Sequence, residues 1–269
     1  MPFTTQSDIK IYHELKGRGN NVLYIGGTGA DLRTKPNVLD SPLAKSHQVL
    51  TFDQRGLGQT EKPLSDYTML EYANDAVQLM DELGWETADV IGTSFGGMVA
   101  LNLAVQNPAR VNKMVLCCTS PGGPDMASYP LHHLPETWSP ADKIRNMMST
   151  NDQRLDDNWQ AANAASVEEM IKVSLSKKPE DHQSPEFKAG AKRQLMARAE
   201  HNVVEALPDI HIPTLICAGK YDGIAPVKNQ EFMREKMPDA KLVWFEGGHL
   251  FMIQDKSAWT VIIDFLAQR

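Results

Sequence analysis

Short apolar runs alternate along the chain with longer segments of helical periodicity. The stretch DIKIYHELKG (residues 8–17) alternates apolar with polar side chains, which is typical of a half-buried strand. The other predicted strands are nearly continuous apolar runs, at residues 22–27, 47–53, 88–92, 111–120, 212–219 and 240–248. Continuous apolar strands that alternate with helices predict an α/β fold, with a mostly parallel central sheet and helices on both faces.

The helical segments between these strands carry recognisable ends. Residues 67–84 contain Thr68 and Glu71 at capping-box spacing, and Gly84 stands where the helix should stop. The remaining helices expected in this part of the chain cover residues 95–108, 228–237 and 256–268.

The alternation breaks between Pro121 and about Leu207. Here the pattern predicts only helices, which begin at Ser139, at a Ser166–Glu169 capping box, and after Ser184. We therefore expect an all-helical insertion at residues 122–207 within a core made of residues 1–121 and 208–269. Ligands of α/β proteins bind at the carboxyl ends of the strands, where this insertion emerges, so we interpret it as a cap or lid rather than as a purely structural layer.

Composition narrows the class of protein. The chain has 269 residues, of which 42% are hydrophobic and 23% charged, as expected for a globular protein. Its 27 basic and 34 acidic residues give a net charge of −7, and without a basic stretch a nucleic-acid partner is not expected. The three cysteines lie in apolar runs, which predicts buried, reduced thiols. We find no signal peptide or membrane span and expect a cytoplasmic protein without a membrane partner. No coiled-coil heptads mark an oligomer interface, so the oligomeric state stays open.

One serine lies among small residues between a predicted strand and a predicted helix. The segment GTSFGG fits the pattern G-x-S-x-G with Gly92, Ser94 and Gly96. A serine at such a sharp turn projects its hydroxyl above the sheet, and the residues two positions away must be small to avoid a clash. The alternative is a tight turn in which the serine only caps the helix. The remaining chemistry favours a nucleophile.

A nucleophilic serine needs a base, and the base needs an acid that orients it. His249 follows the last predicted strand in FEGGHLF, and Asp222 follows the preceding strand in AGKYDGIAP. Three loops at strand ends thus offer Ser94, Asp222 and His249 in that order, which predicts a catalytic triad. The weaker histidine candidates lie in or beside strands, or in the insertion, where a solvated role and a substrate-facing role are both open: His13, His211, His132 and His133.

Together these motifs resemble the α/β-hydrolase family over nearly the whole chain. FDQRGLGQT is similar to the family's D-x-R-G-x-G-x-S segment, with Thr60 in place of the serine. The resemblance implies that the insertion is the family's cap. It also implies an oxyanion hole formed by the N–H of Phe95 and an N–H from the loop IGGTGAD, where we choose Thr28. Many relatives have His-Gly in that loop, and this chain has Gly26-Gly27.

The sequence matches no complete cofactor-binding or metal-binding motif. GGTGAD lacks the third glycine of a dinucleotide-binding turn, and GTSFGG is followed by Met98 rather than the lysine of a phosphate-binding loop. The chain has neither an H-E-x-x-H nor a C-x-x-C motif. We expect no cofactor and no metal.

The sequence therefore predicts a cofactor-independent serine hydrolase that cleaves a small, partly apolar carboxylic ester or lactone through an acyl-enzyme. A serine in the turn argues against the dehalogenase and epoxide hydrolase branches, whose nucleophile is a carboxylate. Two alternatives stay open: a carbon–carbon bond hydrolase of ring-cleavage-type diketones with the same triad, and a non-catalytic ligand-binding protein. An arginine that pairs with a substrate carboxylate would help to decide, and the unranked candidates are Arg55, Arg145, Arg193 and Arg198.

Overall fold

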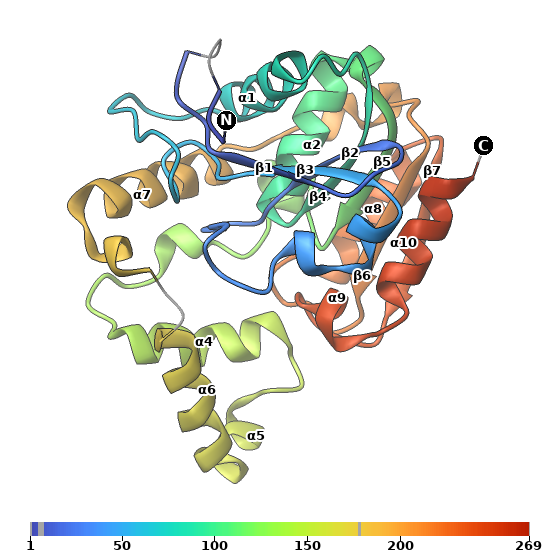
Figure 1. Cartoon of the computed structure of the whole chain (residues 1–269). Helices are drawn as coiled ribbons and strands as arrows, with labels where there is room; N and C mark the ends of the chain where they lie inside the picture. The colour runs from blue at the N-terminus through green and yellow to red at the C-terminus, as the bar shows by residue number, and fades with distance from the viewer. Residues whose placement is uncertain (1, 5–7, 177–178, 269) are drawn as a thin grey trace.

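The computed structural model describes residues 2–4, 8–176 and 179–268, and within them seven strands form a single sheet (Figure 1). The strand order is β1-β3-β2-β4-β5-β6-β7. Only β1 runs antiparallel to its neighbour, so the prediction of a mostly parallel sheet is confirmed. The strands are β1 (His13–Lys16), β2 (Asn21–Ile25), β3 (Gln48–Phe52), β4 (Ala88–Thr93), β5 (Val111–Cys117), β6 (Thr214–Gly219) and β7 (Ala240–Phe245).

The parallel register brings the predicted site residues to one edge of the sheet. Ile25 of β2 pairs with Gly92 of β4, and Gly219 of β6 pairs with Phe245 of β7. Strands in parallel register end together, so the loops that follow them share the carboxyl edge.

Helices cover both faces of the sheet, as predicted. Alternate strand residues divide between two apolar cores: Leu23 packs with α1 and α2, whereas Val22 packs with α10. The core helices are α1 (Met69–Glu82), α2 (Phe95–Gln106), α8 (Val227–Lys236), α9 (Phe251–Gln254) and α10 (Ala258–Ala267). No helix in the described ranges is long and apolar enough to cross a membrane.

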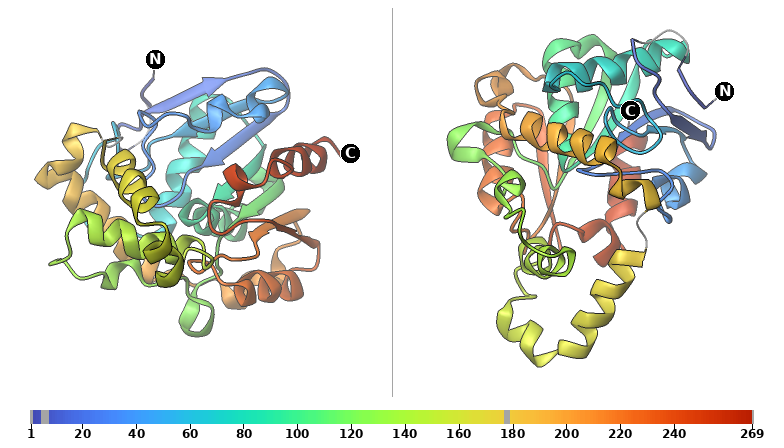
Figure 2. Two further views of the ribbon diagram at one scale, coloured as in Figure 1. Left: turned by 90° about the horizontal axis from the view of Figure 1, so that it is seen from below. Right: turned by 90° about the vertical axis from the view of Figure 1, so that its left-hand side faces the viewer.

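Between β5 and β6 the described residues form helices and turns, with isolated β-bridges at Gly122 and no strand. The α-helices are α3 (Gly123–Met126), α4 (Pro140–Asn151), α5 (Asp157–Ala162), α6 (Ala164–Ser176) and α7 (Pro185–Ala199). Helices α4 to α6 project from the core around a small cluster of Met148, Val167 and Ile171, while α7 lies against the core (Figures 1 and 2). The 3₁₀ turns among the described residues are Val38–Asp40, Pro42–Lys45, Pro108–Arg110, Leu131–His133, Glu180–Gln183 and Val204–Asp209.

Most predicted helix starts are confirmed, and one is wrong. The Thr68–Glu71 capping box is present, and the hydroxyls of Ser139 and Ser184 cap α4 and α7. The predicted box at Ser166 does not form, because α6 begins two residues earlier at Ala164. The carbonyl of Asn163 already accepts from the N–H of Val167 at 3.1 Å. The alanine pair before Ser166 favours helix, so it extends the helix past the expected cap. The short helix α5 was not predicted.

Candidate active site

Ser94 lies in a strained turn between β4 and α2. Its backbone has φ 55° and ψ −117°, a region that side-chain-bearing residues rarely adopt and that costs on the order of 1–3 kcal/mol. The turn is held from both sides. The Ser94 N–H donates to Cys117 O at 2.8 Å, and Ser94 O accepts from the Thr119 hydroxyl at 2.7 Å. The surrounding bonds therefore fix the direction of the Ser94 side chain.

The glycines around Ser94 are required by close backbone approach. A Cβ on Gly92 would lie 2.3 Å from Gly96 O, and a Cβ on Gly96 would lie 2.0 Å from Ile25 O. Real Cβ atoms essentially never approach closer than 3.0 Å. Both positions therefore admit only glycine unless the backbone moves, which is the steric reason predicted from the G-x-S-x-G pattern.

Ser94, His249 and Asp222 form one series of hydrogen bonds. The Ser94 Oγ lies 2.9 Å from His249 Nε2, and His249 Nδ1 lies 2.8 Å from Asp222 Oδ2. The other carboxylate oxygen, Asp222 Oδ1, accepts from the backbone N–H groups of Ile224 and Ala225 at 2.8 and 2.9 Å. An ionised carboxylate can only accept, so His249 carries its proton on Nδ1 and leaves Nε2 free to accept from Ser94.

The series is buried, and a thiol lies against it. Ser94 and His249 are each 9% exposed and Asp222 is 3% exposed. Cys118 adopts φ 43°, and its Sγ lies within 4.8 Å of ligand atoms of both Asp222 and His249. Burial, with a contribution from Asp222, raises the pKa of Cys118 well above its usual value, so the thiol stays neutral. These three residues also form the one close group of metal-type ligands in the described part of the chain, but His249 and Asp222 already bond to each other. All three cysteines are free and buried, as predicted.

The loop after β2 passes beside Ser94. A Cβ on Gly27 would lie 3.4 Å from Ser94 Cβ, and Gln54 Nε2 donates to Gly26 O at 2.8 Å. The backbone N–H groups of Thr28 and Phe95 donate to no other group in the described ranges. Phe95 directly follows Ser94, and Thr28 directly follows Gly27, which lies against Ser94. These two free amides are therefore candidates to bind a developing negative charge, and the N-terminus of α2 adds its positive end.

The segment FDQRGLGQT holds this loop in place. Asp53 accepts from the N–H of Leu32 at 2.7 Å and from the N–H of Gln59 at 2.8 Å. Thr60, which replaces the family's serine, donates its hydroxyl to Asp53 O at 2.5 Å. The threonine therefore keeps a hydroxyl at this position, and this hydroxyl joins the end of the segment to its aspartate.

The insertion is hydrogen-bonded to the same loop. Gln194 of α7 accepts from the N–H of Gly29 at 2.9 Å. Asp31 accepts from Arg33 at 2.6 Å and lies 2.9 Å from His182 Nε2 of the insertion. Sequence reasoning missed Gln194 and Thr119, because side-chain contacts between segments far apart in the chain leave no local pattern.

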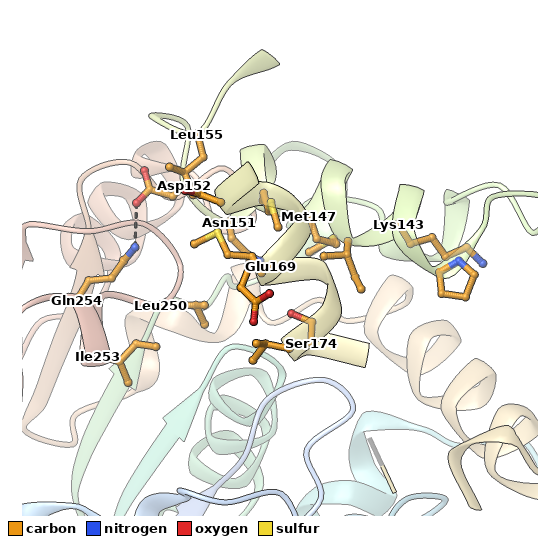
Figure 3. A pocket seen from close by; sticks show the side chains of 16 residues that line it. Lys143, Met147, Asn151, Asp152, Leu155, Glu169, Ser174, Leu250, Ile253 and Gln254 are labelled. Carbon is orange, nitrogen blue, oxygen red and sulfur yellow. Dashed lines mark hydrogen bonds between the residues drawn. The ribbon is translucent and has the colours of Figure 1, made fainter. Parts of the chain in front are cut away.

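A large groove opens between the projecting helices and the segment that follows His249 (Figure 3). It has a volume of about 1120 Å³, and its lining is mostly apolar. Met147 of α4 and Met170 of α6 lie on one side, and Leu250 and Ile253 lie on the other. The N–H of His249 donates to Asn151 O at the rim, so the groove adjoins the segment that carries His249.

Comparison with known proteins identifies the family of the chain. A family model described as "alpha/beta hydrolase fold" matches residues 20–256, and the chain belongs to that family. It is similar to the 2-hydroxymuconate semialdehyde hydrolase of Pseudomonas sp. (strain CF600), with 28% identity over 260 residues that cover 94% of this chain and 88% of the relative. It is also similar to the poly(3-hydroxyalkanoate) depolymerase of Ectopseudomonas oleovorans, with 27% identity over 252 residues, 92% of this chain and 84% of the relative.

Solved structures share the fold. The enol-lactonase from Burkholderia xenovorans LB400 superposes with a TM-score of 0.76 at 21% identity, over 99% of this chain and 100% of that one. The relatives are named for a semialdehyde, a polyester and an enol-lactone. Membership of a hydrolase family is therefore established, and it leaves the substrate class open.

Proposed function

We propose that this protein is a cofactor-independent serine hydrolase that cleaves a small carboxylic ester or lactone through an acyl-enzyme. The observation that carries the proposal is the hydrogen-bonded series of Ser94, His249 and Asp222, with distances of 2.9 and 2.8 Å. These contacts are within the reach that proton transfer to and from a nucleophile requires.

In this mechanism His249 Nε2 takes the proton of Ser94 as its Oγ attacks the carbonyl carbon. Asp222 holds the imidazole with its proton on Nδ1 and stabilises the imidazolium that forms. His249 then gives the proton to the leaving oxygen. Water, activated by the same Nε2, attacks the acyl-enzyme and releases the acid.

We assign the oxyanion hole to the backbone N–H groups of Phe95 and Thr28. Two observations support this role: neither N–H donates to another described group, and each residue directly follows one that lies at the turn, Ser94 itself or Gly27 against it. One such donor is typically worth about 2.7–4 kcal/mol of transition-state stabilisation.

Residues 122–207 act in this proposal as the cap over the substrate. The groove of about 1120 Å³ beside the His249 segment is large enough for a small molecule, and its methionine side chains suit an adaptable apolar group. We therefore expect the substrate to be small and partly apolar.

The test is labelling by a fluorophosphonate probe, which reacts with activated serines. Wild type should label, whereas Ser94→Ala and His249→Ala should not. Ser120→Ala is a matched control, because Ser120 is a fully buried serine at the same sheet edge whose hydroxyl bonds to Met126 O instead. Labelling that persists in a folded Ser94→Ala variant would refute the assignment of the nucleophile.

A second candidate is hydrolysis of a carbon–carbon bond with the same three residues. Its support is the similarity to the 2-hydroxymuconate semialdehyde hydrolase at 28% identity. Turnover of ring-cleavage diketones with rates above those for matched esters would favour it. A folded wild type that does not label and turns over neither class, but binds a ligand, would instead favour the non-catalytic binding protein.

A further inference from the structure

Arg198 of α7 is a buried cation without a counter-ion in the described ranges. Its residue exposure is 5%, and it forms no ion pair with any described carboxylate. Nη1 donates to the backbone oxygen of Tyr129 at 2.7 Å, whereas Nε and Nη2 are buried without a partner in the described part of the chain. Arginine is almost never buried in this way, because the desolvation cost is repaid only by a paired anion and by hydrogen bonds to its remaining N–H groups.

The guanidinium nevertheless stays charged. Burial lowers the pKa of Arg198 to about 10, which is still well above neutral pH. A planar fork with two open donors and a full charge matches the geometry of a carboxylate.

The other arginine candidates are engaged elsewhere. Arg55 forms two 2.7 Å bonds with Asp75 and is buried in that pair. Arg145 pairs with Glu168 on the surface, and Arg193 donates to the carbonyl of Leu64 at 2.9 Å. The structure thus ranks the four arginines that the sequence left unranked.

Arg198 lies on the side of α7 that faces the candidate active site. Gln194, one turn earlier on the same helix face, accepts from the N–H of Gly29 next to Thr28. Tyr129, which binds Arg198, donates its own N–H to Ile224 O, and the N–H of Ile224 donates to Asp222. Arg198 is therefore linked through Gln194 to the loop after β2 and through Tyr129 to the loop that carries Asp222.

Three further polar side chains in this region have buried atoms without partners among the described residues. They are the Nε2 of Gln194, the Oγ1 of Thr28 and the Nδ1 of His132. His132 is close enough to Arg198 that burial, His133 and the arginine charge together lower its pKa. Buried polar atoms in native proteins are nearly always satisfied, so a group of them beside one cation indicates a site built for a polar, anionic ligand group.

We propose that Arg198 binds a carboxylate of the substrate, so that the enzyme acts on esters or lactones that carry a negative charge away from the scissile bond. The inference rests on the proposed function, because it names the substrate class of the same site. Gln194 and His132 complete the polar wall around the bound carboxylate.

The experiment compares pairs of substrates that differ only in this charge. The first pair is the mono-p-nitrophenyl ester of adipic acid and p-nitrophenyl hexanoate; the second is the suberic acid monoester and the octanoate. Wild type should prefer the anionic member of at least one pair in kcat/KM, mainly through KM. Arg198→Met should reduce that preference roughly 10- to 100-fold, as expected for lost hydrogen bonds to a charged group. Arg198→Lys should restore part of it.

Arg193→Met is the matched control, since it removes a half-buried arginine of the same helix that bonds to Leu64 O instead, and it should leave the preference unchanged. The proposal would be overturned if wild type preferred the anionic ester in neither pair. It would also be overturned if wild type and Arg198→Met showed the same ratio of kcat/KM between the anionic and the neutral ester. An equal loss of preference in Arg193→Met would also overturn the proposal. The preference would then come from the total positive charge of the helix and not from direct binding by Arg198. Calorimetric binding of adipate to wild type and Arg198→Lys needs no turnover. It therefore separates failure of this subsite from failure of the proposed function.

Discussion

Replacing Asp222 by asparagine should invert the hydrogen-bond direction along the whole series. The two oxygens of Asp222 are not equivalent: Oδ1 accepts from the N–H groups of Ile224 and Ala225, and Oδ2 faces His249 Nδ1. In Asp222→Asn the amide oxygen must occupy the Oδ1 position, because the two backbone donors there need an acceptor. The side-chain NH₂ group then points at His249.

The size of the effect follows from these contacts. The reverse orientation would set two buried N–H groups against another donor, at about 1–3 kcal/mol each, so the amide is held in place. An NH₂ group at His249 Nδ1 forces that nitrogen to accept and moves the proton to Nε2. The imidazole then donates to Ser94 and cannot take its proton. A wrong tautomer of this kind lowers catalysis by about 10⁴-fold in a serine protease, and we expect a similar loss here.

The assay is the rate constant for fluorophosphonate labelling, with proton–nitrogen NMR of His249 to identify the tautomer. Asp89→Asn is the control, because it removes another buried carboxylate at the start of β4 that does not contact His249. A rate for Asp222→Asn within tenfold of wild type, or a proton still on Nδ1, would refute the reasoning.

Two further predictions concern the loop after β2. In Gly96→Ala, the new Cβ would lie 2.0 Å from Ile25 O and must retreat to at least 3.0 Å, which displaces the backbone beside Ser94. We expect labelling to fall about 100-fold; unchanged labelling would contradict the role of the glycine. Burial alone would raise the pKa of Asp31, but bonds from Arg33 and His182 outweigh it and lower the pKa from 3.8 to about 2. Asp31 therefore stabilises the fold by about 2 kcal/mol above pH 3.8, and this contribution is lost as the pH falls through about 2. Urea unfolding of wild type and Asp31→Asn should differ by that amount at pH 6 and converge toward pH 2; a constant difference would contradict the assignment.

Much of the fold could be predicted from the sequence, because its strands are continuous apolar runs and its helices carry local caps. Thr68, Ser139 and Ser184 form the predicted caps, since each acts on a backbone group within three residues. The Ser166 cap failed for a local reason as well: the two alanines before it favour helix, and α6 begins at Ala164. Short helices such as α5 lack a periodic pattern long enough to detect.

The series of Ser94, Asp222 and His249 could be proposed from the sequence because each follows a strand, and parallel strands end at one edge. The surroundings of these residues could not. Whether Arg198 has a partner depends on which side chains fold against α7. Arg55 looks equivalent in the sequence, but it forms an ion pair with Asp75 of α1. The approach of Cys118 to Asp222 and His249 likewise depends on a positive φ that no local motif indicates.

The bonds from Gln194 to Gly29 and from His182 to Asp31 have a consequence for exchanging parts between related enzymes. The insertion does not rest on the core as a detachable module, because it is hydrogen-bonded to the loop that carries Thr28. A chimera with a relative's insertion would lose both bonds unless it supplied an acceptor opposite Gly29 and a donor opposite Asp31. The insertion and the loop after β2 must therefore change together, whichever substrate the enzyme takes.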